Sequence, residues 1–415
     1  MTATRRGTPI SRLRQSGQAA TLLLLGAGWA VSAFLLLRTS VPSLDLDGLD
    51  VHRYFTDDQL GDAHRYERLV RVSWLLSVLA TIAALVVLVR RAPRLARGLE
   101  LGPVGGGIVL GMVTLVTVWF VKLPFGFVDQ WWAKRHGLGT SNYLAWLLAP
   151  WLTVLIEAIS AMATIAIVMG LAQRLGDRWW VAGAPVLAAI VAAFAFLAGW
   201  AQASNTRPVP YHFRDDVARL EAAEGVVGTP VRVEEVSDFT NQVNAITVGI
   251  GPSTHVVLWD TLLTDPDLND AEVDAVIAHE LGHVKHRHIA KSVAWFALLA
   301  FPLAWAVALV TRRQGGMRKP GAVPLAVLTL FVLGQLTTPL QNAVSRRYEA
   351  EADWEALEAT RDPTAVSGVF QSFAESNLAE PNPPVWDYLL LENHPTLAQR
   401  IAMAEEWKRR NGGAG

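Results

Sequence analysis

Seven runs of apolar residues constrain this chain more than any other feature. They lie at about 19–37, 72–89, 104–121, 150–172, 180–200, 293–310 and 322–340, and each is close to the roughly 20 residues that a helix needs to cross a bilayer. Arginines precede the first run, as in a signal peptide, but six runs follow it and no small-residue cleavage site ends it. We therefore predict a mainly α-helical integral membrane protein with seven transmembrane helices that contact the lipid bilayer.

Composition excludes several functional classes. Hydrophobic residues make up 52% of the 415 residues and charged residues only 18%, which argues against an ordinary soluble protein. The formal net charge of -1, without a basic stripe, argues against nucleic acid as a partner. Because the sequence has no cysteine, catalysis could rest only on histidines, carboxylates, hydroxyls or a bound metal.

Basic residues near the ends of the apolar runs predict the orientation, because lysine and arginine are retained on the cytoplasmic side of a membrane. With the N-terminus inside, the inner segments hold fourteen of them: Arg5, Arg6, Arg12, Arg14, Arg90, Arg91, Arg94, Arg97, Arg174, Arg178, Arg312, Arg313, Arg318 and Lys319. The opposite short segments hold eight: Arg38, Arg53, Arg65, Arg68, Arg71, Lys122, Lys134 and Arg135. We therefore expect the long polar segments on the extracytoplasmic side.

The polar and apolar segments predict five parts. These are an N-terminal tail (1–18), a five-span membrane region (19–206), a first polar part (207–292), two further spans (293–340) and a second polar part (341–415). Residue patterns in the first polar part predict a helix from Asp215 to Glu224 and a small β-sheet with strands at Val231–Glu234, Ala245–Val248 and His255–Trp259. A further helix begins at Asn269, where Glu272 completes a capping box.

The helix that begins at Asn269 carries the pattern His279-Glu280-Leu281-Gly282-His283. Two histidines four residues apart project from one helix face and can bind one zinc ion, while the glutamate between them reaches the water that the metal activates. The alternative is that both histidines are ordinary solvated residues of a helix. The spacing favours a zinc site.

A catalytic zinc needs a third protein ligand and one open position. The metzincin pattern requires Gly and His where this chain has His286 and Ile289, so that subclass is excluded. Glu349 and Asp353 lie four residues apart just after the last apolar run, which fits a second helix that supplies a carboxylate ligand and an acid that orients a ligand histidine. Such acids alone could be solvated surface, but beside the histidine pattern we predict Glu349 as the third ligand.

These residues predict a zinc metalloendopeptidase. We expect one Zn²⁺ per chain, held by His279, His283 and Glu349, with Asp353 behind a ligand histidine. Glu280 is the predicted catalytic base, which takes a proton from the attacking water and later delivers it to the leaving amine. The substrate would be a peptide or protein that is hydrophobic, lipidated or otherwise associated with the membrane.

Several separated motifs resemble the CAAX prenyl protease 1 family of intramembrane zinc metallopeptidases. The resemblance runs from about 208 to 403, and its motifs are Asn244-Ala245 followed by Gly249, Asp260 to Leu263, Ala278 to His283, Ser345 to Asp353, and His394-Pro395 with Arg400-Ile401. It implies seven spans around a water-filled chamber and a gluzincin-like zinc peptidase domain. It also implies that Asn244 and Ala245 belong to an edge strand that pairs with the substrate backbone, and that His394 and Arg400 contact the substrate carbonyl or oxyanion.

Three polar residues outside these motifs have less specific interpretations. His286 and His288 are poorly spaced as ligands, and we interpret them as solvated loop histidines. Glu157 lies inside the fourth apolar run, where an ionisable group usually faces a cavity or a partner. It could line a chamber or be a buried, hydrogen-bonded carboxyl, and we assign it no catalytic role.

Two other functions stay open at this point. A membrane quality-control metalloprotease of the HtpX kind has a similar zinc domain, but five predicted spans before His279 exceed what that family has. A non-catalytic multi-pass protein with a vestigial metal site would lack a ligand or the base, whereas this sequence has all of them.

Overall fold

The computed structural model describes residues 26–44, 46 and 48–412. After an apolar helix at Gly26–Leu36, its helices are α2 (Asp57–Arg97), α3 (Pro103–Arg135), α4 (Tyr143–Leu148), α5 (Trp151–Leu175), α6 (Trp179–Ser204), α7 (Arg214–Glu224), α8 (Asp260–Thr264), α9 (Asp270–Lys285), α10 (His288–Thr311), α11 (Val323–Thr360), α12 (Pro363–Ser376), α13 (Val385–Leu390) and α14 (Leu397–Asn411). The strands are β1 (Arg207–Pro208), β2 (Val231–Glu234), β3 (Ala245–Val248) and β4 (His255–Trp259). The predicted tail at 1–18 and the first part of the predicted span at 19–37 lie outside the described residues.

The long helices agree with a multi-pass membrane protein, although not with a definite count of seven spans. Five helical runs are long and apolar enough to cross a membrane: Asp57–Arg97, Pro103–Arg135, Tyr143–Ser204, His288–Gln314 and Pro320–Thr360. The third of these runs includes both α5 and α6, which the sequence predicted as separate spans. Within the part of the chain that is described, the first predicted span is present only as the shorter helix Gly26–Leu36.

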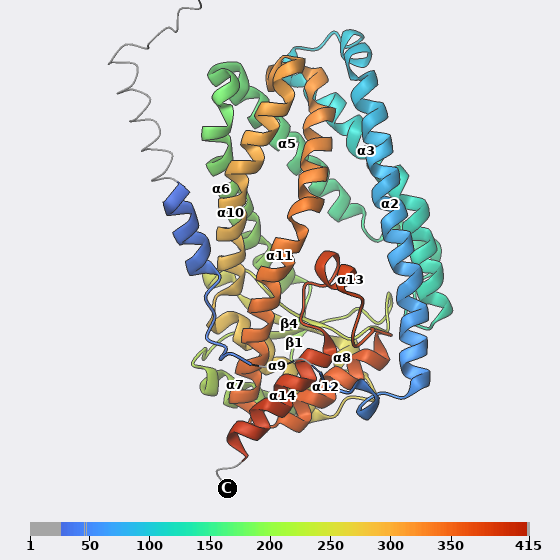
Figure 1. The fold of residues 1–415 in the computed structure, drawn as a ribbon, viewed down its shortest axis with the longest axis vertical. Coiled ribbons are helices and arrows are strands. Elements are labelled where there is room, and N and C mark those ends of the chain that lie inside the picture. Colours follow the sequence, from blue (N-terminus) through green and yellow to red (C-terminus); the bar gives the residue numbers. More distant parts are fainter. Residues whose placement is uncertain (1–25, 45, 47, 413–415) are drawn as a thin grey trace, which may run out of the picture.

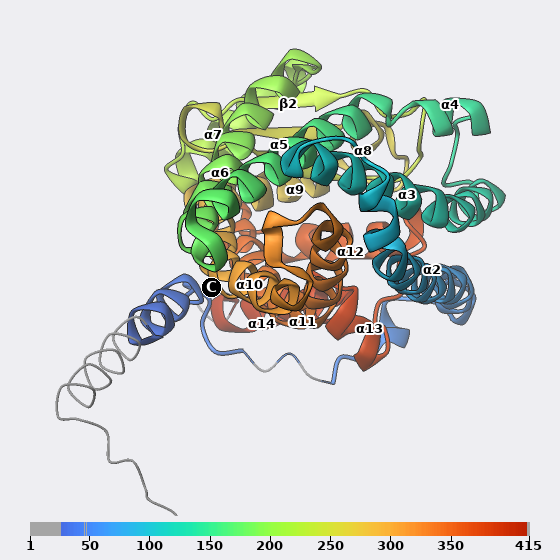
Figure 2. The same ribbon diagram turned by 90° about the horizontal axis from the view of Figure 1, so that it is seen from above.

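Six long helices form a closed ring. Along the chain α2 packs against α3, α3 against α5, α5 against α6, α6 against α10, α10 against α11, and α11 returns to α2. Figure 1 shows these helices side by side in the upper part of the molecule, and Figure 2 shows them from above. Large apolar side chains such as Leu79, Phe120 and Leu336 are exposed on them by 55%, 60% and 70%, as expected of surfaces that face lipid instead of water.

The strands and the helices α7, α8, α9, α12 and α14 form a compact domain at one end of this ring, in the lower part of Figure 1. The sheet order is β1-β2-β4-β3, with β2 and β4 parallel and β3 antiparallel to β4. The three predicted strands are confirmed. The structure adds a fourth, β1, which was not predicted because it has only two residues. Because β3 is the last strand in this order, its outer edge has no strand partner among the described residues.

One hydrophobic core holds this domain together. Buried residues from the sheet, from α7 and α9, from the end of α11 and from α12 and α14 belong to a single cluster that includes Leu220, Leu258, Ile277, Leu357 and Ile401. The two polar segments that are distant in the sequence therefore fold into one body. The predicted start of the helix at Asn269 is also confirmed, since Asn269 caps α9 and its side chain forms a capping box with Glu272.

Two helices continue from the ring into this domain. α10 begins at His288 and α11 runs unbroken from Val323 to Thr360. Each helix therefore continues across a predicted boundary between a polar part and a membrane span, at 292/293 and at 340/341, and the division into five parts stays a prediction.

One of the two interpretations of Glu157 is wrong, because Glu157 in α5 is exposed and makes no hydrogen bond to any described residue. A buried, hydrogen-bonded carboxyl is thereby excluded.

Candidate metal centre

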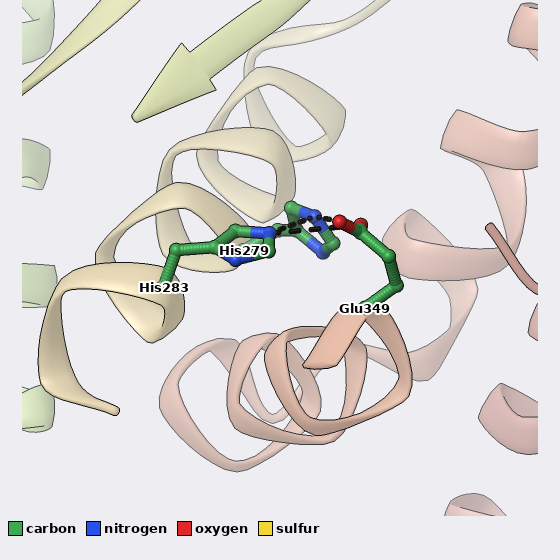
Figure 3. A group of neighbouring side chains, drawn as sticks. All are labelled: His279, His283 and Glu349. Atoms are coloured by element: carbon green, nitrogen blue, oxygen red, sulfur yellow. Dashed lines mark hydrogen bonds and ion pairs between the residues drawn. The ribbon is translucent and has the colours of Figure 1, made fainter. Parts of the chain in front are cut away.

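The two histidines of α9 and one carboxylate of α11 converge on a single point (Figure 3). The Nε2 atoms of His279 and His283 lie 3.1 Å apart. The Oε2 atom of Glu349 lies 3.2 Å from Nε2 of His279 and 3.6 Å from Nε2 of His283. These three residues are the group of side chains, within the described parts of the chain, whose ligand atoms are placed to hold one metal ion.

The donor set fits a zinc-sized cation. Tetrahedral bonds of about 2.0–2.2 Å place ligand atoms about 3.3–3.6 Å apart, close to the separations found here. The Oε2 atom of Glu349 is buried and makes no well-formed hydrogen bond to a described residue, as expected where a cation would complete its interactions. Burial alone would lower the pKa of His279, but the carboxylates of Asp353 and Glu349 outweigh it and raise that pKa to about 10. The pocket therefore attracts positive charge.

A glycine brings the two ligand helices together. A Cβ atom on Gly282 would lie only 3.2 Å from Cα of Ala352 and 3.2 Å from Cβ of Glu355. The backbones of α9 and α11 therefore approach closely between His283 and Glu349, and a larger residue would push them apart. This contact explains how a carboxylate 66 positions after His283 reaches the same point.

Asp353 lies behind the first histidine, one helix turn after Glu349. Its Oδ1 atom is 2.8 Å from Nδ1 of His279, on the side of the ring that faces away from the candidate metal. Arg400 binds the same carboxylate in a bidentate manner, at 2.6 and 2.8 Å, and both side chains are buried. The arrangement orients His279, so one turn of α11 contributes both the candidate ligand Glu349 and the carboxylate that supports a second candidate ligand, His279.

Glu280 is positioned by a residue that the sequence analysis missed. The hydroxyl of Thr247 in β3 lies 2.8 Å from Oε2 of Glu280 and 2.9 Å from the backbone oxygen of the same residue. Both side chains are buried, so the carboxylate of Glu280 has one fixed position beside the histidines. Only the place of Thr247 on an inward-facing strand position could have indicated this contact.

A cavity of 290 Å³ opens over these residues. Its walls include Asn244 and Ala245 from the open edge of β3, together with His394 and Arg400 from the C-terminal segment. The Nε2 atom of His394 is 3.2 Å from Oε2 of Glu349, and its side chain is 46% exposed. The structure thus brings together all nine residues predicted for the site, while their roles stay predictions.

The interpretation of His286 and His288 as solvated loop residues is wrong. His288 begins α10 and is only 2% exposed. Its Nδ1 atom lies 2.8 Å from Nδ1 of His283. His286 is half-buried and pairs with Glu355 at 2.7 Å. The burial of these histidines could not be predicted from the sequence, because it depends on the turn between α9 and α10 at Arg287, which adopts a left-handed conformation with φ 54°.

Taken together, these features define a class of protein. A helical membrane ring carries a peptidase-like domain in which two histidines, a carboxylate as third candidate ligand and a buried glutamate meet at the edge of a β-sheet. This arrangement is suited to metal-assisted hydrolysis of a bond in an extended peptide.

Comparisons with known proteins agree with this class. Residues 214–408 match peptidase family M48. The metalloprotease YhfN of Bacillus subtilis is 26% identical over 321 residues, 73% of each chain. A CAAX prenyl protease 1 homolog of Oryza sativa is 28% identical over 46% of this chain and 47% of its own length. A protease HtpX homolog of Acidiphilium cryptum is 28% identical over 54% of this chain and 88% of its own.

A solved structure shows the same fold. The crystal structure of Ste24p from S. mikatae superimposes with a TM-score of 0.74 over 91% of this chain and 96% of its own, at 16% identity. Residues 214–408 form a peptidase family M48 domain, and these relatives support a membrane metallopeptidase that is similar to the CAAX prenyl proteases. The resemblance seen in the sequence is confirmed. These relatives are named as proteases, which favours an enzyme over the alternative of a non-catalytic membrane protein.

Proposed function

We propose that this protein is a zinc-dependent endopeptidase that hydrolyses hydrophobic, lipidated or membrane-associated polypeptides. The observation that carries the proposal is the convergence of His279, His283 and Glu349 at separations of 3.1 to 3.6 Å. One Zn²⁺ per chain would be held by these three side chains. When bound there, it would polarise the scissile carbonyl and make the attacking water more acidic.

Glu280 is the proposed general base. Its Oε2 atom already accepts the hydrogen bond of Thr247, so Oε1 is the atom left to take the proton from the attacking water. The same carboxyl then protonates the leaving amine. Because Glu280 is 6% exposed, bulk water has little access to the proton that it holds between these two steps.

The open edge of β3 is the proposed binding site for the substrate backbone. Ala245 to Val248 pair with β4 on one side only, and Asn244 to Thr247 line the cavity on the other. An extended peptide could add to this edge as a further strand, with its scissile bond beside Glu280. His394 reaches the same space and is the proposed donor to the substrate carbonyl or the oxyanion, together with the remaining nitrogen of Arg400.

The lipidated substrate class is supported by the rice relative, which is named a CAAX prenyl protease 1 homolog. Relatives named protease HtpX support a protease without indicating a lipidated substrate. Comparing cleavage of a farnesylated peptide with cleavage of its unmodified form tests whether the lipid is required.

We also propose that the catalytic domain lies on the extracytoplasmic side of the membrane. The short loops on the opposite side of the membrane hold more basic residues, and basic residues are retained in the cytoplasm.

Purified wild-type protein and its Glu280→Gln variant provide the test. We expect the wild type to contain about one zinc ion per chain and to cleave a peptide substrate, with cleavage abolished by a chelator. The variant should keep its zinc and lose activity by about 10²–10⁴-fold, because only the proton acceptor has changed. Equal turnover in both proteins would disprove the mechanism, and a wild type without bound zinc would disprove the metal site.

A further inference from the structure

His288 and Glu351 form a buried chain of hydrogen bonds that ends at a candidate metal ligand. Nδ1 of His288 is 2.8 Å from Nδ1 of His283, and Nε2 of His288 is 3.0 Å from Oε2 of Glu351. Both side chains are only 2% exposed. Neither residue belongs to the ligand set or to the base, yet burying a carboxylate is costly unless its interactions are satisfied.

The direction of these hydrogen bonds follows from the metal site. If Nε2 of His283 faces the cation, its other nitrogen, Nδ1, carries the ring hydrogen. That hydrogen can be donated only to an unprotonated Nδ1 of His288, so the hydrogen of His288 is on Nε2 and is donated to Glu351. The carboxylate thus fixes one tautomer of His288, which in turn fixes one tautomer of His283.

The end of the helix Gly26–Leu36 and the residues just after it hold the far end of this hydrogen-bond chain. The backbone N–H of Ser40 donates to Oε1 of Glu351, and Lys291 lies 3.4 Å from Oε2. Tyr348, which stacks on the ring of His288 at a centroid distance of 4.6 Å, donates its hydroxyl hydrogen to the backbone oxygen of Leu36 at 2.8 Å. The segment that follows Gly26–Leu36 therefore packs against the same turn of α11 that carries Glu349.

We propose that His288 and Glu351 are positioning residues that hold His283 in the orientation and tautomer required for metal binding, with Ser40 anchoring Glu351. The inference rests on the proposed zinc site. The two candidate ligand histidines are then supported in different ways. Asp353 contacts His279 directly, whereas Glu351 supports His283 through His288.

The test compares zinc affinity by chelator competition in the purified full-length protein. Substitutions of supporting residues weaken metal binding by about 10–100-fold, and we expect that range for His288→Leu, which leaves Nδ1 of His283 without a partner. His288→Asn keeps an acceptor near the position of Nδ1 and should recover part of the affinity. Glu351→Gln should weaken zinc binding by about tenfold, and the double variant His288→Leu with Glu351→Gln should bind no more weakly than His288→Leu alone.

Glu355→Gln is the matched control. Glu355 lies one turn after Glu351 on α11, is 8% exposed and pairs with Lys285 and His286, but it does not contact His283. The control should keep wild-type zinc affinity and the wild-type visible spectrum of the cobalt-substituted protein, whereas His288→Leu should shift that spectrum. If the wild type binds zinc and all the His288 and Glu351 variants bind it equally well, the positioning role is refuted and the proposed function stands. If the wild type binds none, the proposed function itself fails.

Discussion

At the scale of single residues, burial determines which polar groups have specific partners. Glu351, Asp353 and Arg400 are all buried, and each has at least one charged or hydrogen-bonding neighbour. Glu224 at the end of α7 is an exception: it is 5% exposed, and neither of its carboxyl oxygens has a hydrogen-bond partner among the described residues. Burial, together with the charge of Glu355, raises the pKa of Glu224 to about 8.

A glutamate with this pKa makes the stability of the protein depend on pH. Since the folded-state pKa lies above the ordinary value of 4.5, the folded state binds the proton more tightly, and this contribution is present below about pH 4.5 and is lost as the pH rises through about 8. Glu224→Gln should therefore resemble the wild type near pH 4.5 and be more stable above pH 8, by on the order of a few kcal/mol.

Thermal unfolding followed by tryptophan fluorescence at a fixed scan rate, from pH 5 to 9, measures this difference. Glu235→Gln is the control, because Glu235 is 73% exposed and its replacement should leave the pH profile unchanged. A constant gap between Glu224→Gln and the wild type at every pH would contradict the prediction.

At the scale of elements, the site depends on the contact between α9 and α11. α9 supplies His279, Glu280 and His283, and α11 supplies Glu349 and Asp353, so their spacing sets the geometry of the ligands. Gly282 permits this spacing. The continuous helix α11 also connects the candidate ligand Glu349 to a segment that is long and apolar enough to cross a membrane.

Gly282→Ala should disturb both the packing and the metal site. Its added methyl group lies 3.2 Å from Cα of Ala352 and 3.2 Å from Cβ of Glu355, so α11 must move by a few tenths of an ångström. Overpacking of this kind costs about 1–3 kcal/mol. We expect a lower unfolding temperature and weaker zinc binding by chelator competition.

Gly334→Ala provides the comparison within α11. A Cβ atom at Gly334 meets nothing within 4 Å, so alanine should leave zinc binding unchanged and favour the helix slightly. Wild-type zinc affinity in Gly282→Ala would show that the close approach of the helices does not position Glu349.

At the scale of the whole molecule, the ring of helices and the peptidase domain depend on each other. α10 and α11 belong to both. Leu36, at the end of the helix Gly26–Leu36, and Ser40, just after it, contact Tyr348 and Glu351 beside the candidate metal centre. The candidate metal centre therefore lies where the ring of helices meets the peptidase domain, as the proposed cleavage of membrane-associated substrates requires.

The orientation of this assembly can be tested with fusions. A reporter that is active only in the cytoplasm should be silent when fused after Gly415 and active when inserted near Gly315, because fourteen basic residues lie on the side of the latter loop and eight lie on the opposite side. The reverse pattern would place the catalytic domain in the cytoplasm, leaving the peptidase mechanism unaffected.

Local chemistry in the sequence was sufficient for much of this protein. The lengths of the apolar runs predicted its membrane helices, capping and alternation predicted α9 and the strands β2 to β4, and the i, i+4 spacing predicted which side chains share a helix face. These are properties of short segments, and segments with strong signals fold as their residues prefer. The number of spans was less certain, because α5 and α6 form part of one helical run.

Only the tertiary structure decided which distant residues meet. The approach of α11 to Gly282, the hydroxyl of Thr247 beside Glu280, and the chain from Ser40 through Glu351 and His288 to His283 join segments that lie up to 311 positions apart. No local pattern encodes such contacts, because they follow from how whole helices pack. For that reason His288, which the sequence suggested was a solvated loop residue, proved to be buried against a candidate ligand of the metal.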